Sequence, residues 1–337
     1  MYSLLGLCLA LAALLIFNAL ASLAAAGLWR ALKWRVAEWP AAMRARLLFA
    51  LRFVPPALSL LVVGTLLVPA YLIHEPRDTD EVVTLRLAAL AGLSIIGIAL
   101  ALWRGVAAWL ATRRLAAEWT THAKPLHIDG LSLPAYSLRH PFPLIAIVGV
   151  FRPRIFVATH LLAALSPDEL AAAIEHELGH LAARDNLKRA LLRACRDALT
   201  IVPTGRALDL AWAECAEIAA DEYAARVRGQ AGALDLASAL IKIARLVPAG
   251  AKPVTAMAPA GLLSSYVAAD GQVSERVRKL ANLSTDALNF PSQSLPTRLL
   301  HWVCGCGLLV SLTCAAIDPR VQRLTHDALE HGVALFQ

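Results

Sequence analysis

Apolar residues fill four long stretches of the chain, at residues 4–29, 53–73, 87–111 and 299–317. An α-helix crosses the hydrocarbon core of a bilayer with about 20 mostly apolar residues. The pattern therefore predicts four transmembrane helices, three of them close together and the fourth near the end of the chain. The pair Pro55-Pro56 stands near the start of the second stretch, where we expect it to kink the helix or delay its beginning.

Charged residues between the stretches predict how the helices are oriented. Residues 30–52 hold six Lys and Arg side chains against one acid, whereas residues 74–81 hold four acids against one arginine. Cytoplasmic loops of membrane proteins collect Lys and Arg. We therefore expect a membrane region over residues 1–111 with its N-terminus outside, a cytoplasmic domain over 112–298, and an extracytoplasmic tail over 318–337. This orientation, in a bacterial-type inner membrane, accounts for the net charge of +7 without direct nucleic acid binding.

The composition agrees with a membrane protein. Hydrophobic residues make up 58% and charged residues 17% of the 337 residues, and the mean hydropathy is +0.59. Soluble domains are about 45–50% apolar and about 25% charged. An ordinary soluble protein and an intrinsically disordered chain are both excluded on this basis. The six cysteines have no regular spacing, which argues against a disulfide framework.

Residues 112–298 are long enough for one domain with its own hydrophobic core. Short apolar runs within 126–157, bounded by prolines and a glycine, predict strands. The run Ser166-Pro-Asp-Glu169 predicts a capped helix start, and a later helix is expected over 206–228, ending before Gly229. The expected fold class is a mainly α membrane protein with a cytoplasmic α+β domain inserted between its third and fourth transmembrane helices.

The candidate chemistry lies in the helix predicted after Ser166. It contains His176-Glu177-Leu-Gly-His180, in which the two histidines lie one turn apart on the same face, so that both imidazoles reach one ion. Glu177 lies about 100° around the helix axis from His176, where it is positioned to take a proton from an attacking water. This is the H-E-x-x-H pattern of zinc hydrolases. It predicts one Zn²⁺ per chain and Glu177 as the catalytic base.

A catalytic zinc ion takes three protein ligands and keeps one open position. The helix predicted over 206–228 supplies three acids at offsets of three and seven residues, namely Glu214, Glu217 and Asp221. Glu217 is the preferred third ligand, with Glu214 as its competitor and Asp185 as a weaker alternative. Asp221, one turn after Glu217, is then placed to accept the distal N–H of a ligating histidine and to fix its tautomer.

The two motifs resemble those of a known family. His176-Glu-Leu-Gly-His180, continued by Leu-Ala-Ala-Arg184-Asp185, resembles the H-E-L-x-H-x-x-R-x-D signature of the BlaR/MecR-type membrane metallopeptidases. The acid is in register, whereas the arginine falls one place late. Glu217-Ile-Ala-Ala-Asp221 is similar to the second family signature, E-x-x-A-D. Shorter likenesses cover residues 149–157, 166–170 and Glu275-Arg276-Val277 with Leu280, so that the resemblance extends over nearly the whole chain.

This resemblance implies a gluzincin-type zinc metalloprotease domain with His176, His180 and Glu217 as zinc ligands, Glu177 as the base and Asp221 as support for a ligand. It implies a weaker role in oxyanion stabilisation for Arg276. It also implies that one strand binds the substrate backbone by edge addition; the residues of this strand are Arg154, Ile155, Phe156 and Val157. The antibiotic-sensing members carry a penicillin-binding domain after the last transmembrane helix, whereas residues 318–337 follow it here. We therefore expect no β-lactam sensor in this chain, and a trigger from a separate partner protein or from membrane lipid.

The leading hypothesis is an integral-membrane zinc endopeptidase that cleaves a cytoplasmic or membrane-proximal protein. The resemblance implies a regulatory protease of signal transduction, with a transcriptional repressor as its substrate. One alternative is a quality-control or processing peptidase of the HtpX or CAAX-protease type, which shares both motifs. The other alternative is a signalling scaffold that keeps the zinc fold without turnover.

Overall fold

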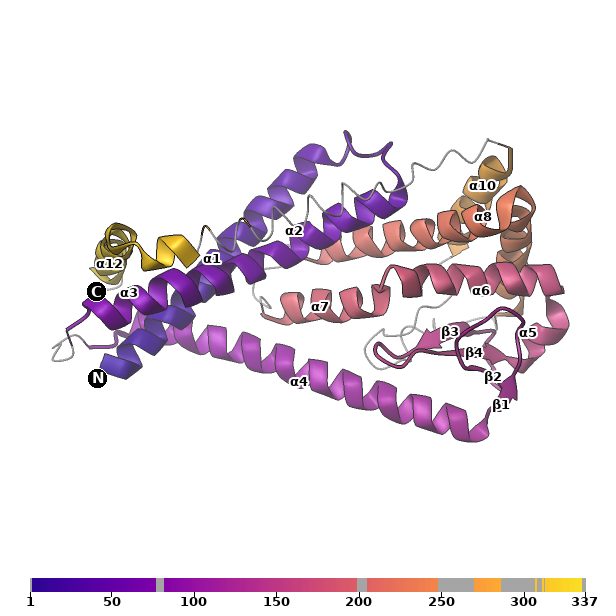
Figure 1. Cartoon of the computed structure of the whole chain (residues 1–337), viewed down its shortest axis with the longest axis horizontal. Helices are drawn as coiled ribbons and strands as arrows, with labels where there is room; N and C mark the ends of the chain where they lie inside the picture. The colour runs from indigo at the N-terminus through magenta and orange to yellow at the C-terminus, as the bar shows by residue number, and fades with distance from the viewer. Residues whose placement is uncertain are drawn as a thin grey trace.

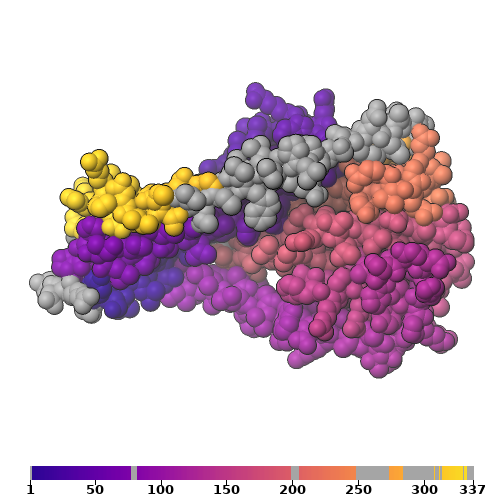
Figure 2. Space-filling model, viewed as in Figure 1, coloured from indigo at the N-terminus to yellow at the C-terminus, as the bar shows by residue number. Residues whose placement is uncertain are grey.

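The computed structural model describes residues 2–76, 82–198, 205–247, 270–285, 307, 311 and 313–334. The described part is mainly helical and elongated (Figure 1). Long helices form one end, and a small sheet packed among helices forms the other. Figure 2 shows the same division on the surface, where the helical end is narrower than the end that contains the sheet.

Three helical segments are long and apolar enough to cross a membrane. They are α1 (Tyr2–Leu32), the continuous run of α2 (Ala41–Val62), the π-helical turn η1 (Val63–Leu67) and α3 (Val68–His74), and α4 (Leu85–His122). Large apolar side chains point outward from them; Trp103 on α4, for example, is 68% exposed. Such exposure is costly in water and normal in lipid, so these helices fit a membrane protein.

These helices are longer than the apolar stretches from which they are predicted. The second helix begins at Ala41 directly after Pro40, so Pro55 and Pro56 lie inside it and do not delay its start. The third continues to His122 because neither proline nor glycine interrupts residues 106–122, although its apolar stretch ends at residue 111. The boundary predicted at residue 112 therefore falls within a helix. Most of the fourth predicted transmembrane segment, 299–317, lies outside the described residues.

Four short strands form a mixed sheet, where the sequence predicted strands. They are β1 (Lys124–Leu126), β2 (Ala135–Leu138), β3 (Ile145–Val148) and β4 (Arg154–Ala158), in the order β1-β2-β4-β3. β4 pairs parallel with β2 and antiparallel with β3. β4 is therefore an inner strand with both edges paired.

The helices around the metal-binding motifs follow the sheet. They are α5 (Thr159–Ala164), α6 (Pro167–Ala182), α7 (Asp185–Ala198), α8 (Gly205–Leu246) and α10 (Asp270–Thr285). The capping box predicted for α6 is present, because Ser166 Oγ accepts from the Glu169 amide and the Glu169 carboxylate accepts from the Ser166 amide. α8 changes direction at Gly229, whose φ of 74° is left-handed, as the sequence predicted for the end of that helix.

Two helices that follow the sheet also pack against the apolar helices. α7 contacts α4, and the first half of α8 contacts α2 (Figure 1). Arg104 Nη1 lies 2.9 Å from Asp197 Oδ1, and Arg52 Nε lies 3.4 Å from Asp209 Oδ1. A methyl group added to Gly97 would lie 2.6 Å from the Ala198 carbonyl oxygen, so the end of α7 touches the apolar part of α4.

The helix nearest the end of the chain lies at the opposite end of the molecule from the sheet. This helix, α12 (Pro319–Ala334), packs against α3 and η1 (Figure 1). His326 stacks on His74 with ring centroids 5.6 Å apart. The positions of the sheet and of α12 agree with the predicted placement of the domain and the tail on opposite sides of a membrane, which remains a prediction.

Candidate metal centre

The two histidines of the H-E-x-x-H motif lie one turn apart in the interior of α6. Their side chains are buried, and their ring centroids are 4.9 Å apart. The capping box at the start of α6 satisfies the backbone of its first turn. On its other side, the pair is close to α8, where a methyl group added to Gly179 would lie 3.2 Å from the Ala220 Cα. Only a small residue at position 179 allows this approach.

An aspartate binds the Nδ1 atom of each histidine. Asp221 Oδ1 lies 2.8 Å from His176 Nδ1, and Asp185 Oδ2 lies 2.8 Å from His180 Nδ1. Both carboxylates are buried, so the bonds are charge-assisted and shielded from water. With both Nδ1–H groups engaged, the Nε2 atoms are left as the metal-binding positions.

The residue between α6 and α7 positions Asp185. Arg184 has a φ of 55°, the one left-handed value among the described residues other than glycine. This conformation ends α6 and starts α7 at once, which brings the first residue of α7 back onto His180, five positions earlier. The predicted helix stop at Asp185 is thus a tight turn. Asp185, considered a weaker ligand from the sequence, instead supports a histidine.

Glu217 on α8 completes the cluster. Its two carboxylate oxygens lie 3.6 Å from His176 Nε2 and 3.5 Å from His180 Nε2. One ligand atom from each of the three residues falls within 4.8 Å of the other two. His180 Nε2 and Glu217 Oε2 are buried and make no hydrogen bond to the described residues. Two imidazoles and one carboxylate that converge in this way form a donor set that fits zinc.

Glu214, the alternative third ligand, does not reach this cluster. Its side chain is exposed, whereas Glu217 is 18% exposed at the side chain and faces α6. The offset of three residues turns Glu214 about 60° away from Glu217 around the helix axis. The packing of α8 on α6 therefore decides between two acids that the sequence pattern left open.

Two arginines border the acidic side of the cluster. Arg276 on α10 makes a two-pronged contact with Asp221, through Nε at 2.7 Å and Nη2 at 2.6 Å, and its Nη1 lies 3.4 Å from Glu217. Arg189 on α7 donates to Glu217 at 3.2 Å. Arg276 therefore faces one carboxylate that supports a histidine and one that is a candidate ligand, and its predicted contact with an oxyanion remains a prediction. Arg189 was not predicted from the sequence, where it is one of several basic residues on α7.

The charges of these groups shift their pKa values in opposite directions. Burial tends to lower the pKa of His180, but Glu217 and Asp185 outweigh it and raise that pKa to about 10. Burial tends to raise the pKa of Glu217, but the histidines and Arg276 lower it well below its usual range. Glu217 is therefore anionic, and His180 must release a proton before its Nε2 binds a cation.

Glu177 follows His176 in α6 and is fully buried. Its position next to His176, a candidate metal ligand, on a neighbouring face of the helix, is the place that the H-E-x-x-H motif assigns to a general base. The structure thus brings Glu177 and the three predicted ligands into one buried region.

The strand predicted to bind substrate by edge addition has no free edge. Ile155, Phe156 and Val157 are fully buried in β4, and both sides of β4 are paired within the described sheet. Arg154, at its start, donates to Thr120 Oγ1 of α4 at 2.8 Å. The prediction was wrong because an apolar run of this kind fits an inner strand better than an edge strand.

Among the described strands, β3 is the outer neighbour of β4. Asn186 Nδ2 donates to the carbonyl oxygens of Ile147 at 3.2 Å and Gly149 at 3.4 Å. Asn186 directly follows Asp185, so this side chain connects β3 to the support of His180. The sequence offered one signal for it, an asparagine in the first turn of a helix.

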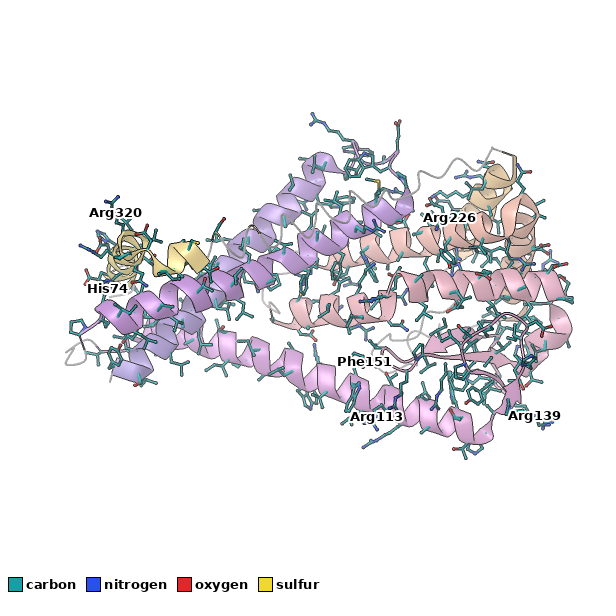
Figure 3. All side chains as sticks on the ribbon, in the orientation of Figure 1. His74, Arg113, Arg139, Phe151, Arg226 and Arg320 are labelled. Carbon is teal, nitrogen blue, oxygen red and sulfur yellow. The ribbon has the colours of Figure 1, made fainter. Side chains whose placement is uncertain are left out.

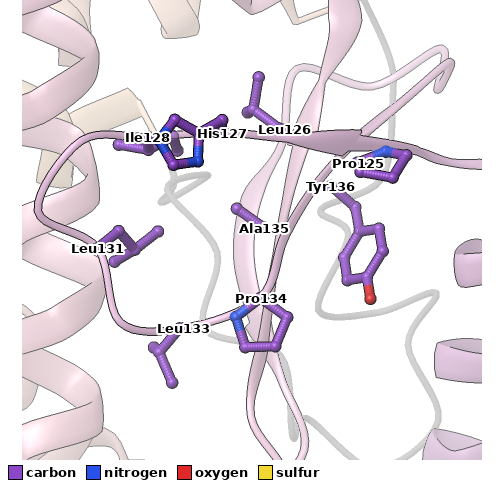
Figure 4. A pocket seen from close by; sticks show the side chains of 9 residues that line it. All are labelled: Pro125, Leu126, His127, Ile128, Leu131, Leu133, Pro134, Ala135 and Tyr136. Atoms are coloured by element: carbon purple, nitrogen blue, oxygen red, sulfur yellow. The ribbon is translucent and has the colours of Figure 1, made fainter.

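A separate pocket of about 300 Å³ lies at the connection between β1 and β2 (Figure 4). It is lined by Pro125, Leu126, His127, Ile128, Leu131, Leu133, Pro134, Ala135 and Tyr136. None of the residues of the metal cluster lines it. The exposed His127 pairs with Asp129 at 3.4 Å instead of facing another metal-binding side chain. The pocket therefore does not belong to the metal centre.

Comparison with known proteins supports the metallopeptidase interpretation. The model of Peptidase family M48 matches residues 146–214. The match begins in β3, includes the whole H-E-x-x-H motif and ends before Glu217. A search of curated proteins finds no match. The peptidase class predicted from the sequence is supported in this way, whereas the BlaR/MecR-type relationship is not confirmed.

Proposed function

We propose that this chain is a membrane-embedded zinc endopeptidase whose active site is the cluster of His176, His180 and Glu217. One observation carries the proposal: both Nε2 atoms converge on one carboxylate, while each Nδ1 is held by its own buried aspartate. In a chance group of acids and histidines on a surface, no buried aspartate is expected at the Nδ1 atom of each histidine. The arrangement is typical of a protein that binds a metal ion in a defined geometry.

The chemistry follows from the positions of the side chains. Zinc bound by these ligands would polarise the scissile carbonyl and lower the pKa of a water molecule to about 7. Glu177 takes the proton of the attacking water and passes it to the leaving amine. Asp221 and Asp185 keep the two imidazoles in the required tautomer. Arg276 and Arg189 balance the charge of the carboxylates, and a contact of Arg276 with the oxyanion is part of the proposal.

We place the catalytic domain in the cytoplasm and propose a membrane-proximal or cytoplasmic protein as the substrate. The charge distribution around the apolar stretches supports this orientation. Contacts of α7 and α8 with α4 and α2 support a site close to the membrane. A regulatory role, such as repressor cleavage triggered by a separate sensor, is part of the proposal and rests on the motif resemblance.

A second candidate is a general quality-control or processing peptidase. The match to Peptidase family M48 supports a peptidase and gives no support to a regulatory role in particular. Comparing the proteins that accumulate in cells with the wild-type chain and with an inactive variant separates the two roles. One accumulating regulator indicates a regulatory protease, whereas many misfolded membrane proteins indicate quality control.

The test of the peptidase proposal is Glu177→Gln, with zinc content and cleavage measured together in detergent or nanodiscs. The substitution retains the size of the side chain and removes the base. We expect about one zinc ion per chain in both proteins, and cleavage of a peptide library by the wild type alone. Equal cleavage by both would refute the mechanism. Zinc in neither protein would favour a scaffold that keeps the fold without turnover.

A further inference from the structure

The turn between β3 and β4 exposes an aromatic side chain. Phe151 is 84% exposed, and its neighbour Arg152 is also exposed. An isolated apolar side chain on a protein surface needs no explanation. Here, however, the ring stands at the tip of a hairpin whose two strands are tied to α7 and α4, and a basic residue, Arg152, directly follows it.

One glycine conformation and the hydrogen bonds of two side chains fix the turn of residues 149–153 and the strands beside it. Gly149 has a φ of 105°, and a methyl group added to it would lie 2.8 Å from the Arg152 carbonyl oxygen, so the turn requires glycine. Asn186 donates to the carbonyl oxygens of Ile147 and Gly149, which ties one strand to α7. Arg154 donates to Thr120, which ties the other strand to α4. The turn therefore stands on two fixed strands, and Phe151 at its tip is exposed.

The tip lies where α4 is expected to leave the bilayer. α4 has 38 residues, which corresponds to roughly 57 Å, whereas the hydrocarbon core is about 30 Å thick. The adjacent pair Arg113-Arg114 follows its apolar stretch. Figure 3 shows Phe151 and Arg113 at a similar position along the long axis of the molecule, whereas Arg139 lies at the far end of the domain.

Other aromatic and basic side chains occur at the same side of the predicted membrane. Trp109 is 44% exposed, and Arg113 Cζ lies 4.8 Å above its ring. In the connection between α1 and α2, Trp34 is 76% exposed, and Lys33 Nζ lies 4.7 Å above its ring. Figure 1 shows this connection and the β3–β4 turn at a similar position along the long axis. Tryptophan combined with Lys and Arg is typical of the cytoplasmic membrane interface.

We propose that the hairpin tip is a membrane anchor. The ring of Phe151 enters the interface of the cytoplasmic leaflet, while Arg152, Arg113 and Arg114 bind the phosphate groups of anionic lipids. The combination of one exposed aromatic ring with several cations fits a lipid surface better than an acidic protein. The proposal rests on the membrane embedding of α1–α4 that is part of the proposed function, and it does not require peptidase activity.

The anchor has a consequence for the metal centre. Asn186 holds the hairpin, and Asp185 beside it holds His180. Asp185 and Asn186, in the first turn of α7, thus connect the hairpin to His180. If the tip enters the interface, the metal centre is held at a set height close to the lipid headgroups.

The test places an environment-sensitive fluorophore at defined positions of the full chain in nanodiscs of phosphatidylcholine and phosphatidylglycerol. The native cysteines are first replaced, and Phe151→Cys, Arg139→Cys and Trp103→Cys are labelled separately. Arg139 is exposed at the far end of the domain, and Trp103 is exposed in the apolar part of α4. Zinc content and thermal unfolding of each labelled protein confirm that it is folded.

We expect the label at position 151 to show blue-shifted emission and quenching by lipids that carry a quencher in the upper acyl chain. The label at position 103 should be quenched as well, and the label at 139 should remain water-like. Quenching at 103 but not at 151 would overturn the anchor and leave the membrane embedding intact. A label at 103 that is not quenched would overturn the membrane embedding, and the anchor with it. Neither result depends on peptidase activity.

Discussion

The role of Asp185 leads to a quantitative prediction about zinc affinity. Its carboxylate accepts the Nδ1–H of His180 at 2.8 Å, and both side chains are at most 5% exposed. Removing a carboxylate that supports a metal-binding histidine lowers metal affinity about 10- to 100-fold, which corresponds to about 1.4–2.8 kcal/mol. For Asp185→Ala, the loss of zinc affinity should be near the upper end of this range, because the substitution leaves a buried N–H without an acceptor. For Asp185→Asn, the loss of zinc affinity should be near the lower end, because the amide oxygen of asparagine still accepts a hydrogen bond.

The measurement is a competition titration of metal-free protein with zinc and a chromophoric chelator at pH 7. Glu214→Gln is the matched control, since it removes an acidic side chain from α8 that is exposed and lies outside the cluster. We expect its zinc affinity to stay within about twofold of the wild type. If Asp185→Ala also binds zinc like the wild type, or if Glu214→Gln weakens binding as strongly, the assignment of Asp185 as support for His180 is refuted.

Three further predictions concern stability. The pKa of Glu169, which burial tends to raise, is lowered from 4.5 to about 2 by bonds from Lys242, Ser238 and the Ser166 amide. Because this folded-state value lies below the unfolded one, the stabilisation is present above pH 4.5 and disappears as the pH falls towards 2. Glu169→Gln should therefore lower the unfolding free energy by up to about 3 kcal/mol at pH 7. In denaturant titrations, the difference in unfolding free energy between variant and wild type should become smaller as the pH falls. A difference that stays the same at all pH values contradicts this reasoning. Arg184→Gly should raise the unfolding free energy by roughly 0.5–1 kcal/mol, because glycine adopts the left-handed conformation without strain. A slightly higher apparent Tm would agree with this prediction, and a lower Tm would contradict it. Arg276→Gln should destabilise the metal-free protein by about 3–5 kcal/mol, because it leaves Asp221 and Glu217 buried without this counter-charge. Added zinc should restore part of the loss of Tm, and an unchanged Tm would show that Arg276 does not balance these carboxylates.

Local patterns were sufficient to predict much of the site. The capping box at Ser166 and the spacing of His176 and His180 depend on residues within one helix, whose geometry is the same in any protein. Asp221 was predicted to support a histidine because it follows Glu217 by one turn, and the structure shows this contact. The three long apolar segments were likewise recognised, because the length required to cross a bilayer is fixed by its thickness.

The predictions for one strand and one helix were wrong because they depended on the packing of neighbouring strands and helices. The sequence predicts edge binding of substrate for the run Arg154–Val157, but β2 and β3 pair with both sides of this strand. An apolar strand sequence does not show how many neighbours the strand has. The length of α4 was underestimated for a related reason. Its apolar stretch marks the expected membrane part, whereas the helix continues as long as no residue interrupts it and packing supports it.

The sequence by itself determined the class of site: an H-E-x-x-H helix, a second helix with acids at the right spacing, and apolar segments long enough for a membrane. The tertiary structure decided which acid joins the histidines, because only the packing of α8 on α6 places Glu217 inside and Glu214 outside. It also brought Asp185 onto His180 through the turn at Arg184, and Arg276 onto Asp221 from a helix 55 residues later. These contacts depend on the relative positions of helices, which the spacing of residues along one helix does not encode.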